Sequence, residues 1–248
     1  MIGIVVVSHS PALARAAVDL ALEMGGDDPP AVRIAAGAGG GATGTDAVAI
    51  AAAIDEVATA DGVLVLMDLG SAILSAGMAL EFAASGAPVR LSAAPFVEGL
   101  IAAVVVAGSG ATLDAVDAEA RRALEGKAAQ LEGTAGASVQ AAAGVADAER
   151  GAAPDAVAAS FTGVIRNPSG LHARPAAVFV KAVGRHDAAV TVTDLGTGKG
   201  PASGASLISL MSLGVGQGAR VRIDATGPDA AGVISELQQL VADGFGEV

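Results

Sequence analysis

The first half of the chain alternates between short apolar runs, typical of buried strands, and longer segments with helical periodicity. The run Ile2–Val7 is continuously apolar, as expected for a strand that is buried on both faces of a parallel sheet. Three further strands are expected at Val32–Ala35, Gly62–Met67 and Val89–Ser92. Helices are expected at Pro11–Met24, Asp46–Thr59, Ile73–Ala84, Phe96–Val106 and Leu113–Leu131. Strands that alternate with helices predict an α/β domain with a doubly wound parallel sheet.

The chain after residue 159 follows a different pattern. Strands are expected at Phe161–Arg166, Val190–Asp194 and Arg220–Ala225. Helices are expected at Ala173–Gly184, Ala205–Leu213 and Ala230–Asp243. This order predicts an α+β open-faced sandwich, with helices on one side of an antiparallel sheet. Between the two patterns periodicity fades, so we expect a first domain at 1–132, a flexible linker at 133–159 and a second domain at 160–248.

The net charge of −12 is unevenly distributed along the chain. Residues 1–158 contain 7 basic and 19 acidic side chains, whereas residues 159–248 contain 7 of each. This asymmetry supports two domains with different surfaces. It also argues against nucleic acid as a partner, because a phosphate backbone requires a basic protein face.

The composition argues against several kinds of site and location. The longest apolar run, around Leu100–Ala107, is too short to span a bilayer, so we expect no membrane insertion. Met1–Val7 has the pattern of a strand rather than of a signal peptide, and the absence of Cys fits a cytoplasmic protein. With no Cys and three His, the chain offers little material for a metal cluster, so we expect neither a metal nor a cofactor.

His172 lies in the segment NPSGLHARPAAVFVKAVG. Gly170 allows a tight turn and Pro175 suits the first turn of a helix, so we expect His172 at a helix N-terminus. The unpaired backbone N–H groups there would hold a phosphoryl group on the imidazole. The helix dipole contributes only about 0.3–1 kcal/mol, so we expect Arg174 to bind the phosphoryl oxygens as a second, ionic clamp. A histidine that merely caps the helix is the alternative.

His9 and Asp68 follow the first and third predicted strands. In open α/β sheets, reactive groups gather in the crevice outside the carboxyl ends of the strands. A carboxylate there would accept the Nδ1 proton of His9, set the tautomer, and leave Nε2 free to receive a phosphoryl group. The third histidine, His186, is expected to be a solvated surface residue at the end of a helix.

The segment GLHARPA, followed by SLISLMSLG and QGARVRIDATG, closely resembles the phosphocarrier HPr of the bacterial phosphotransferase system. The resemblance covers about Phe161–Val248 and implies an HPr-like open-faced sandwich. It also implies that enzyme I phosphorylates His172 at the expense of phosphoenolpyruvate, with Arg174 as the assisting charge. Ser206 falls where some HPr proteins carry a regulatory phosphoserine, and a plain helix-capping role is the alternative for this serine.

The segments IVVVSHS, ATGTD, LMDLGSA and APFVEGLIAA resemble the DhaM phosphotransferase subunits of dihydroxyacetone kinase, whose domain has the mannose-type enzyme IIA fold. The resemblance covers about Met1–Ala123 and implies that His9 is phosphorylated and that Asp68 orients it. The residues expected to line the phosphate pocket are Thr43, Gly44, Thr45 and Ser71. The family usually has an Asn and an acidic residue near Ser75–Gly77, where this chain reads SAGM, so contacts with the kinase partner are expected to differ.

These resemblances favour a phosphoryl relay from enzyme I to His172, then to His9, and then to ADP on a separate dihydroxyacetone kinase subunit. Because the sequence shows no enzyme I-like domain, the phosphoenolpyruvate chemistry is expected from another protein. Enzyme IIA domains of this family commonly dimerise, so we also expect a homodimer formed through the N-terminal domain.

Three alternative functions are weighed against this relay. A mannose-type sugar transport component would pass the phosphoryl group from His9 to an enzyme IIB domain. The SHS and MDLGSA segments favour the kinase branch, because the sugar branch usually has a Gly-Gly-Ser-Pro stretch after the strand Asp. A regulatory binding module would accept phosphate on His9 and pass it to nothing. A nucleotide-binding enzyme is disfavoured, because the sequence has no P-loop GxxxxGK[ST].

Overall fold

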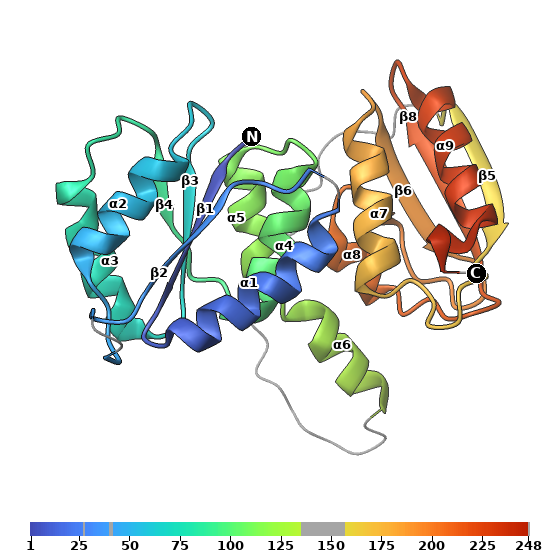
Figure 1. Ribbon diagram of the computed structural model, residues 1–248. Helices are drawn as coiled ribbons and strands as arrows, with labels where there is room; N and C mark the ends of the chain where they lie inside the picture. The colour runs from blue at the N-terminus through green and yellow to red at the C-terminus, as the bar shows by residue number, and fades with distance from the viewer. Residues whose placement is uncertain (27, 40–41, 135–156, 248) are drawn as a thin grey trace.

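The computed structural model describes residues 1–248 except 27, 40–41, 135–156 and 248 (Figure 1). Its first sheet has the strand order β2-β1-β3-β4, and all neighbouring strands are parallel. These strands are β1 (Gly3–Ser8), β2 (Val32–Ala36), β3 (Val63–Met67) and β4 (Val89–Leu91). The accompanying helices are α1 (Pro11–Gly25), α2 (Ala47–Val57), α3 (Gly70–Phe82), α4 (Phe96–Gly108), α5 (Leu113–Arg121) and α6 (Glu125–Thr134).

Strand β1 is buried along its whole length because helices cover both faces of its sheet. Ile4 and Val6 belong to an apolar cluster that includes α1 and α4. Val5 and Val7 point the other way, into a second cluster with α2 and α3. Full burial of one such side chain contributes about 1.5–3 kcal/mol. The predicted α/β doubly wound parallel sheet is therefore confirmed.

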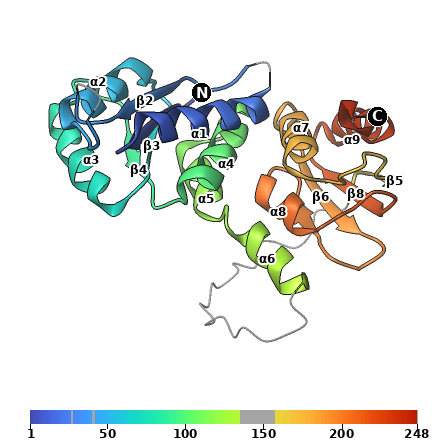
Figure 2. The ribbon, with the colours of Figure 1, turned by 60° about the horizontal axis from the view of Figure 1, so that its bottom comes forward.

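The second sheet is antiparallel and has the strand order β5-β8-β6-β7. Its strands are β5 (Ala159–Val164), β6 (Ala189–Asp194), β7 (Ala202–Ser203) and β8 (Arg220–Thr226). Its helices are α7 (Ala173–Gly184), α8 (Leu207–Ser212) and α9 (Ala230–Ala242), followed by the 3-10 turn η1 (Gly244–Gly246). Burial alternates along β6 and β8, and the three helices cover one side of the sheet (Figure 2). The predicted open-faced sandwich is confirmed.

Several boundaries differ from those expected from the sequence. The helix expected at Leu113–Leu131 is two helices, because the chain turns after Arg121 and α6 then packs against α8. Helix α3 begins at Gly70 rather than at Ile73, and the short edge strand β7 had no predicted counterpart. The linker expected at 133–159 falls largely on 135–156, outside the described residues. No helix in the described ranges is long and apolar enough to cross a membrane.

The two sheets belong to units that contact each other through helices. Helix α7 packs on α1 and α4, and α8 packs on α4 and α6 (Figures 1 and 2). One cluster of buried apolar side chains extends from α4 into α7 and α8. The second unit therefore lies against the sheet face covered by α1 and α4, and α2 and α3 cover the opposite face.

Candidate functional site

His9 and Asp68 meet at one edge of the first sheet. They follow β1 and β3, which are neighbouring parallel strands that pair Val7 with Met67. The His9 Nδ1 lies 2.9 Å from Asp68 Oδ1. The other carboxylate oxygen accepts the His9 backbone N–H at 2.8 Å and the Ser8 hydroxyl at 2.9 Å. The carboxylate therefore holds His9 by both its ring and its backbone, and Nε2 is left to face other groups.

The Asp68 side chain is 6% exposed and the His9 side chain is 21% exposed. Burial raises the pKa of the Asp68 carboxyl, but hydrogen bonds from the His9 ring, the His9 backbone and the Ser8 hydroxyl outweigh it. The pKa of Asp68 consequently lies below its ordinary value. Asp68 is an anion at neutral pH and accepts the Nδ1 proton, so the lone pair on the ring lies at Nε2.

Ser71 lies at the free nitrogen of His9. It is in the first turn of α3, and its Oγ is 3.0 Å from His9 Nε2. The first N–H groups of a helix have no acceptor within that helix, and the dipole adds partial positive charge there. Helix α3 has neither a capping side chain nor an acidic residue in its first turn. Nε2 thus faces a helix end that suits the anionic oxygens of a phosphoryl group.

The other three residues expected in the pocket belong to the loop before α2. The Gly44 N–H donates to the His9 carbonyl oxygen at 3.1 Å. Gly44 has φ +147°, and a Cβ there would lie 2.8 Å from the Ala38 Cβ, so this position requires glycine. Thr45 Oγ1 lies 2.7 Å from Ser75 Oγ and links the loop to α3. Thr43 is exposed and makes no polar contact within the part of the chain that the structure describes.

His172 is the N-cap residue of α7, at the helix end where the sequence predicts it. Its Nε2 lies 3.1 Å from Glu247 Oε1, so Nδ1 is the nitrogen left for other groups. The His172 side chain is 40% exposed. Arg174, in the first turn of α7, is exposed and makes no hydrogen bond or ion pair within the described residues. Its guanidinium is therefore free to move toward an anion on His172.

Three residues that belong to the surroundings of these histidines were not singled out from the sequence. Ser8 is adjacent to His9 in the segment SHS, so the sequence alone could have indicated that it lies near His9. Asn167 is fully buried and donates from Nδ2 to the Gly170 carbonyl and to Glu247 Oε2, while its Oδ1 has no hydrogen-bond partner among the described groups. Glu247 is 75 residues from His172 in sequence, so no local pattern could connect the two.

Ser206 and His186 lie outside both sites. Ser206 is the N-cap of α8, and its Oγ accepts the Ser209 N–H at 3.0 Å, which is the helix-capping role expected as the alternative.

The expectation that His186 is a solvated surface residue is wrong. Its side chain is 17% exposed, with Nδ1 against Asp229 and Nε2 2.7 Å from Glu236. These carboxylates lie on or next to α9, whose position the local sequence around His186 does not reveal.

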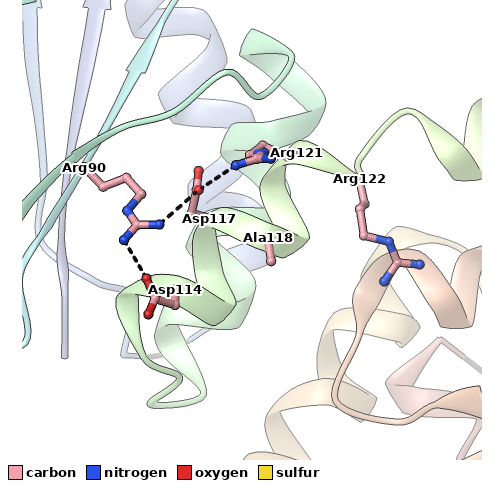
Figure 3. Close-up of a pocket in the computed structure, with 6 residues that line it drawn as sticks. All are labelled: Arg90, Asp114, Asp117, Ala118, Arg121 and Arg122. Carbon is pink, nitrogen blue, oxygen red and sulfur yellow. Dashed lines mark hydrogen bonds and ion pairs between the residues drawn. The ribbon is translucent and has the colours of Figure 1, made fainter. Parts of the chain in front are cut away.

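A hollow of about 730 Å³ lies beside α5, and neither His9 nor His172 lines it (Figure 3). Its lining residues are Arg90, Asp114, Asp117, Ala118, Arg121 and Arg122. Each of its arginines is paired with a carboxylate: Arg90 with Asp114, Arg121 with Asp117, and Arg122 with Glu125. The hollow thus offers no uncompensated positive charge for an anion. Within the described residues, no group of three or more His, Asp or Glu could hold a metal ion.

Two family models match the chain in this order. Residues 3–117 match the model described as the phosphotransferase system fructose IIA component. Residues 159–243 match the model described as the phosphotransferase system HPr component phosphorylation site. His9 and Asp68 fall in the first match, and His172 falls in the second.

Curated relatives match the whole chain or a part of it. The phosphoryl donor subunit DhaM of a PEP-dependent dihydroxyacetone kinase from Klebsiella michiganensis is 40% identical over 253 residues, which cover 100% of this chain and 51% of the relative. The protein of the same name from Escherichia coli K12 is 39% identical over 251 residues, with the same coverage. A multiphosphoryl transfer protein from Salmonella typhimurium is 43% identical over 94 residues, 38% of this chain and 24% of that protein. The chain spans about half the length of the DhaM relatives that it matches.

Proposed function

Because the chain is homologous over its whole length to DhaM phosphoryl donor subunits, we propose that it relays phosphoryl groups from His172 to His9. It joins an enzyme IIA-type domain to an HPr domain of the phosphotransferase system. The observation that carries the proposal is the geometry of His9, with Asp68 at Nδ1 and Ser71 at Nε2. One nitrogen is held by an anion, and the other faces a helix N-terminus.

The arrangement suits reversible transfer at His9. Nε2 attacks the phosphorus in line with the departing nitrogen of phosphorylated His172, and the N–P bond to His172 breaks as the new bond forms. The imidazole of His9 becomes cationic during this step, and the Asp68 anion stabilises that charge through the Nδ1–H. The Ser71 hydroxyl and the N–H groups at the start of α3 receive the phosphoryl oxygens.

The first acceptor in the proposed relay is Nδ1 of His172, because Glu247 occupies Nε2. A phosphoryl group on Nδ1 lies next to the first turn of α7 and within reach of the Arg174 guanidinium, whose planar donors match phosphate oxygens. The donor is enzyme I of the phosphotransferase system, charged by phosphoenolpyruvate. The HPr match supports this assignment.

The final acceptor is ADP bound on a dihydroxyacetone kinase subunit. The relatives named as phosphoryl donor subunits of that kinase support this choice over a sugar transporter. In this proposal the chain donates phosphoryl groups, and the kinase reaction itself takes place on the partner. A cytoplasmic location belongs to the same proposal, since the relay must meet enzyme I, phosphoenolpyruvate and ADP.

The acceptor subunit would dock against α3. It must bring ADP to His9 Nε2, and Ser71 of α3 already contacts that atom. The same helix continues with apolar side chains that are unusually exposed: Leu74 at 74%, Met78 at 54% and Phe82 at 53%. These residues follow one another at intervals of four, so they form one stripe that leads away from the phosphoryl site.

Two structural parts of the proposal concern the whole chain. The domains extend over about 1–132 and 160–248, and the end of α6 at Thr134 and the start of β5 at Ala159 lie within two residues of these bounds. Two chains associate through the N-terminal domain, which is supported by the resemblance of that domain to enzyme IIA domains. Light scattering of the intact chain tests this association, because a monomeric mass at micromolar concentration contradicts it.

The relay is tested with enzyme I, phosphoenolpyruvate and an ADP-loaded kinase subunit. We expect His9→Ala to abolish the phosphorylation of dihydroxyacetone while His172 remains labelled, and His172→Ala to abolish the labelling of both. Product formed by the His9→Ala chain would refute His9 as the donor. Labelling of an enzyme IIB domain in place of the kinase subunit would move the chain to the sugar branch.

A further inference from the structure

Glu119 makes its hydrogen bonds across the contact between the two domains. It lies on α5 of the first domain, and its side chain is 6% exposed. Its Oε1 accepts the Ser206 hydroxyl at 2.8 Å and the Ile208 N–H at 2.7 Å. Ser206 and Ile208 are also buried, at 8% and 3% exposed. A carboxylate of one domain thus binds the start of α8 in the other.

These bonds stabilise the contact because a buried carboxylate is costly unless donors satisfy it. Hydrogen bonds to charged groups are about twice as strong as neutral ones, and an unpaired buried carboxylate is strongly unfavourable. Glu119 meets this requirement through groups that the second domain supplies. Glu119 therefore stabilises the arrangement in which α8 contacts α5, called the docked arrangement below. Arrangements in which the two domains lie side by side without these hydrogen bonds lack this stabilisation.

The docked arrangement keeps the two phosphoryl sites apart. The end of α1 that meets α7 is its C-terminal end, where Gly26 lies beside Lys181. His9 precedes the other end of this 15-residue helix, about 22 Å away at 1.5 Å per residue. His172 lies nine residues before Lys181, at the far end of α7. Figures 1 and 2 agree in showing the first turns of α1 and α7 well separated.

The direction of the His9 ring also opposes transfer in this arrangement. Nε2 faces Ser71 on α3, and α3 covers one face of the first sheet. Helix α7 packs against α1 and α4, which cover the opposite face. Transfer requires the reacting atoms to approach within about 3–3.5 Å in line. Neither the distance along α1 nor the direction of Nε2 meets this requirement.

We propose that the docked arrangement is a resting state of the relay, held closed by Glu119, and that transfer from His172 to His9 requires the domains to separate. The partner of this surface is the second domain of the same chain. The contact surface is formed by α7 and α8 on one side and by α1, α4, α5 and α6 on the other. While this surface is formed, the two histidines are held apart. This inference rests on the proposed function, since it assumes that His172 supplies His9.

Two substitutions open the docked arrangement by different means. Glu119→Ala removes the acceptor of the Ser206 and Ile208 donors. Gly184→Leu adds a side chain on α7, where a Cβ would lie 2.6 Å from the Ser109 Cβ and 2.8 Å from the Ser109 carbonyl oxygen. Gly184 is helical, so a side chain there suits α7 itself, and the three atoms nearest to its Cβ would all belong to Ser109 of the other domain. Gly86→Leu is the matched control, because a Cβ at Gly86 would meet no atom of the described residues within 4 Å.

The measurement is the single-turnover rate at which a phosphoryl group appears on His9 after His172 is charged by enzyme I. We expect Glu119→Ala and Gly184→Leu to raise this rate about tenfold, equivalent to roughly 1.4 kcal/mol of docking free energy. Both variants should also show a larger radius of gyration in solution scattering, whereas Gly86→Leu should match the parent chain. Unchanged rates in both opened variants would overturn the proposal.

A covalent lock gives the converse test. The chain contains no Cys, so the double variant Ser109→Cys, Gly184→Cys has one pair of cysteines that can form a disulfide. Their Cβ atoms need to part by only about 1 Å to reach the separation of a disulfide. The oxidised chain should lose labelling of His9 and regain it on reduction, with Ser109→Cys alone as the control. His172-dependent labelling of His9 in the oxidised chain would overturn the proposal, whereas labelling of His9 in a His172→Ala chain would instead refute the relay.

Discussion

The Asp68 carboxylate binds His9 twice, with one oxygen 2.9 Å from ring Nδ1 and the other 2.8 Å from the backbone N–H of the same residue. The ring and the backbone of His9 are therefore positioned by one anion. The Ser8 hydroxyl gives that anion a third hydrogen bond, at 2.9 Å. This arrangement leaves Nε2 open to other groups, and in the proposed relay it gives Asp68 a role that an amide cannot reproduce.

We expect Asp68→Asn to slow phosphoryl transfer to His9 about 100-fold without unfolding the protein. An amide is similar in size but does not stabilise the cationic imidazole of the transition state as a carboxylate does. The check is the rate of His9 labelling, with Asp19→Asn on the exposed surface of α1 as the control. Equal rates in the two variants would reject the role of Asp68.

Stability at acidic pH should also depend on Asp68. Its pKa is lowered in the folded state, so its stabilising contribution is present above the pKa of the unfolded chain and is lost as pH falls through the folded pKa. We expect the loss of stability below about pH 4 to be less steep in Asp68→Asn than in the parent chain. Urea unfolding at a series of pH values measures this difference, and parallel curves would contradict it.

Ser71 and Thr43 make a matched pair for testing the phosphoryl pocket. Ser71 Oγ lies 3.0 Å from Nε2, whereas Thr43 is exposed without a polar contact in the described residues. We expect Ser71→Ala to slow transfer through His9 by about tenfold or more, since a hydrogen bond to a charged group contributes about 1.5–3 kcal/mol. Thr43→Ala should leave the rate within about twofold of that of the parent chain, because substitutions of exposed residues without special contacts have small effects. A larger effect at Thr43 than at Ser71 would show that the loop, not α3, holds the phosphoryl group.

His186 should make the stability of the second domain depend on pH near neutrality. The Glu236 and Asp229 carboxylates raise the pKa of His186 by hydrogen bonding, against an opposing effect of burial. A raised folded pKa stabilises the protein fully below the unfolded pKa of about 6.5, and this stabilisation is lost as pH rises through the folded value. We expect the Tm to fall as pH rises above 6.5, and His186→Gln to reduce that fall. The same pH dependence in both proteins would contradict this role.

The exposed stripe on α3 should matter for the acceptor and not for the fold. Leu74 is 74% exposed, so Leu74→Asp removes little buried area, but it places a charge where we expect the kinase subunit to dock. We expect KM for the kinase subunit to rise about tenfold or more while labelling of His9 by His172 is unchanged. Leu20→Asp, on α1 and 41% exposed, is the control. A normal KM for Leu74→Asp would place the docking surface elsewhere.

The sequence by itself determined the fold class and pointed to His9 and His172 as the candidate phosphoryl carriers. The apolar runs of β1 and β3 predict parallel strands, and their carboxyl ends must lie at one edge of a sheet, which is why His9 and Asp68 were expected together. The Gly170 turn and the α7 pattern likewise placed His172 at a helix N-terminus. In each case, the information lies within a few residues or in the general geometry of a parallel sheet.

The tertiary structure decided the contacts that join distant parts of the chain. The start of α3 at Gly70 lies before the first apolar periodicity of the helix, so the pattern alone could not place Ser71 in its first turn. His186 meets Asp229 and Glu236 from 43 and 50 residues away, and Glu119 meets Ser206 across 87 residues. A single hydrogen bond of this kind leaves no periodic trace in the sequence, because it depends on how whole helices pack against one another.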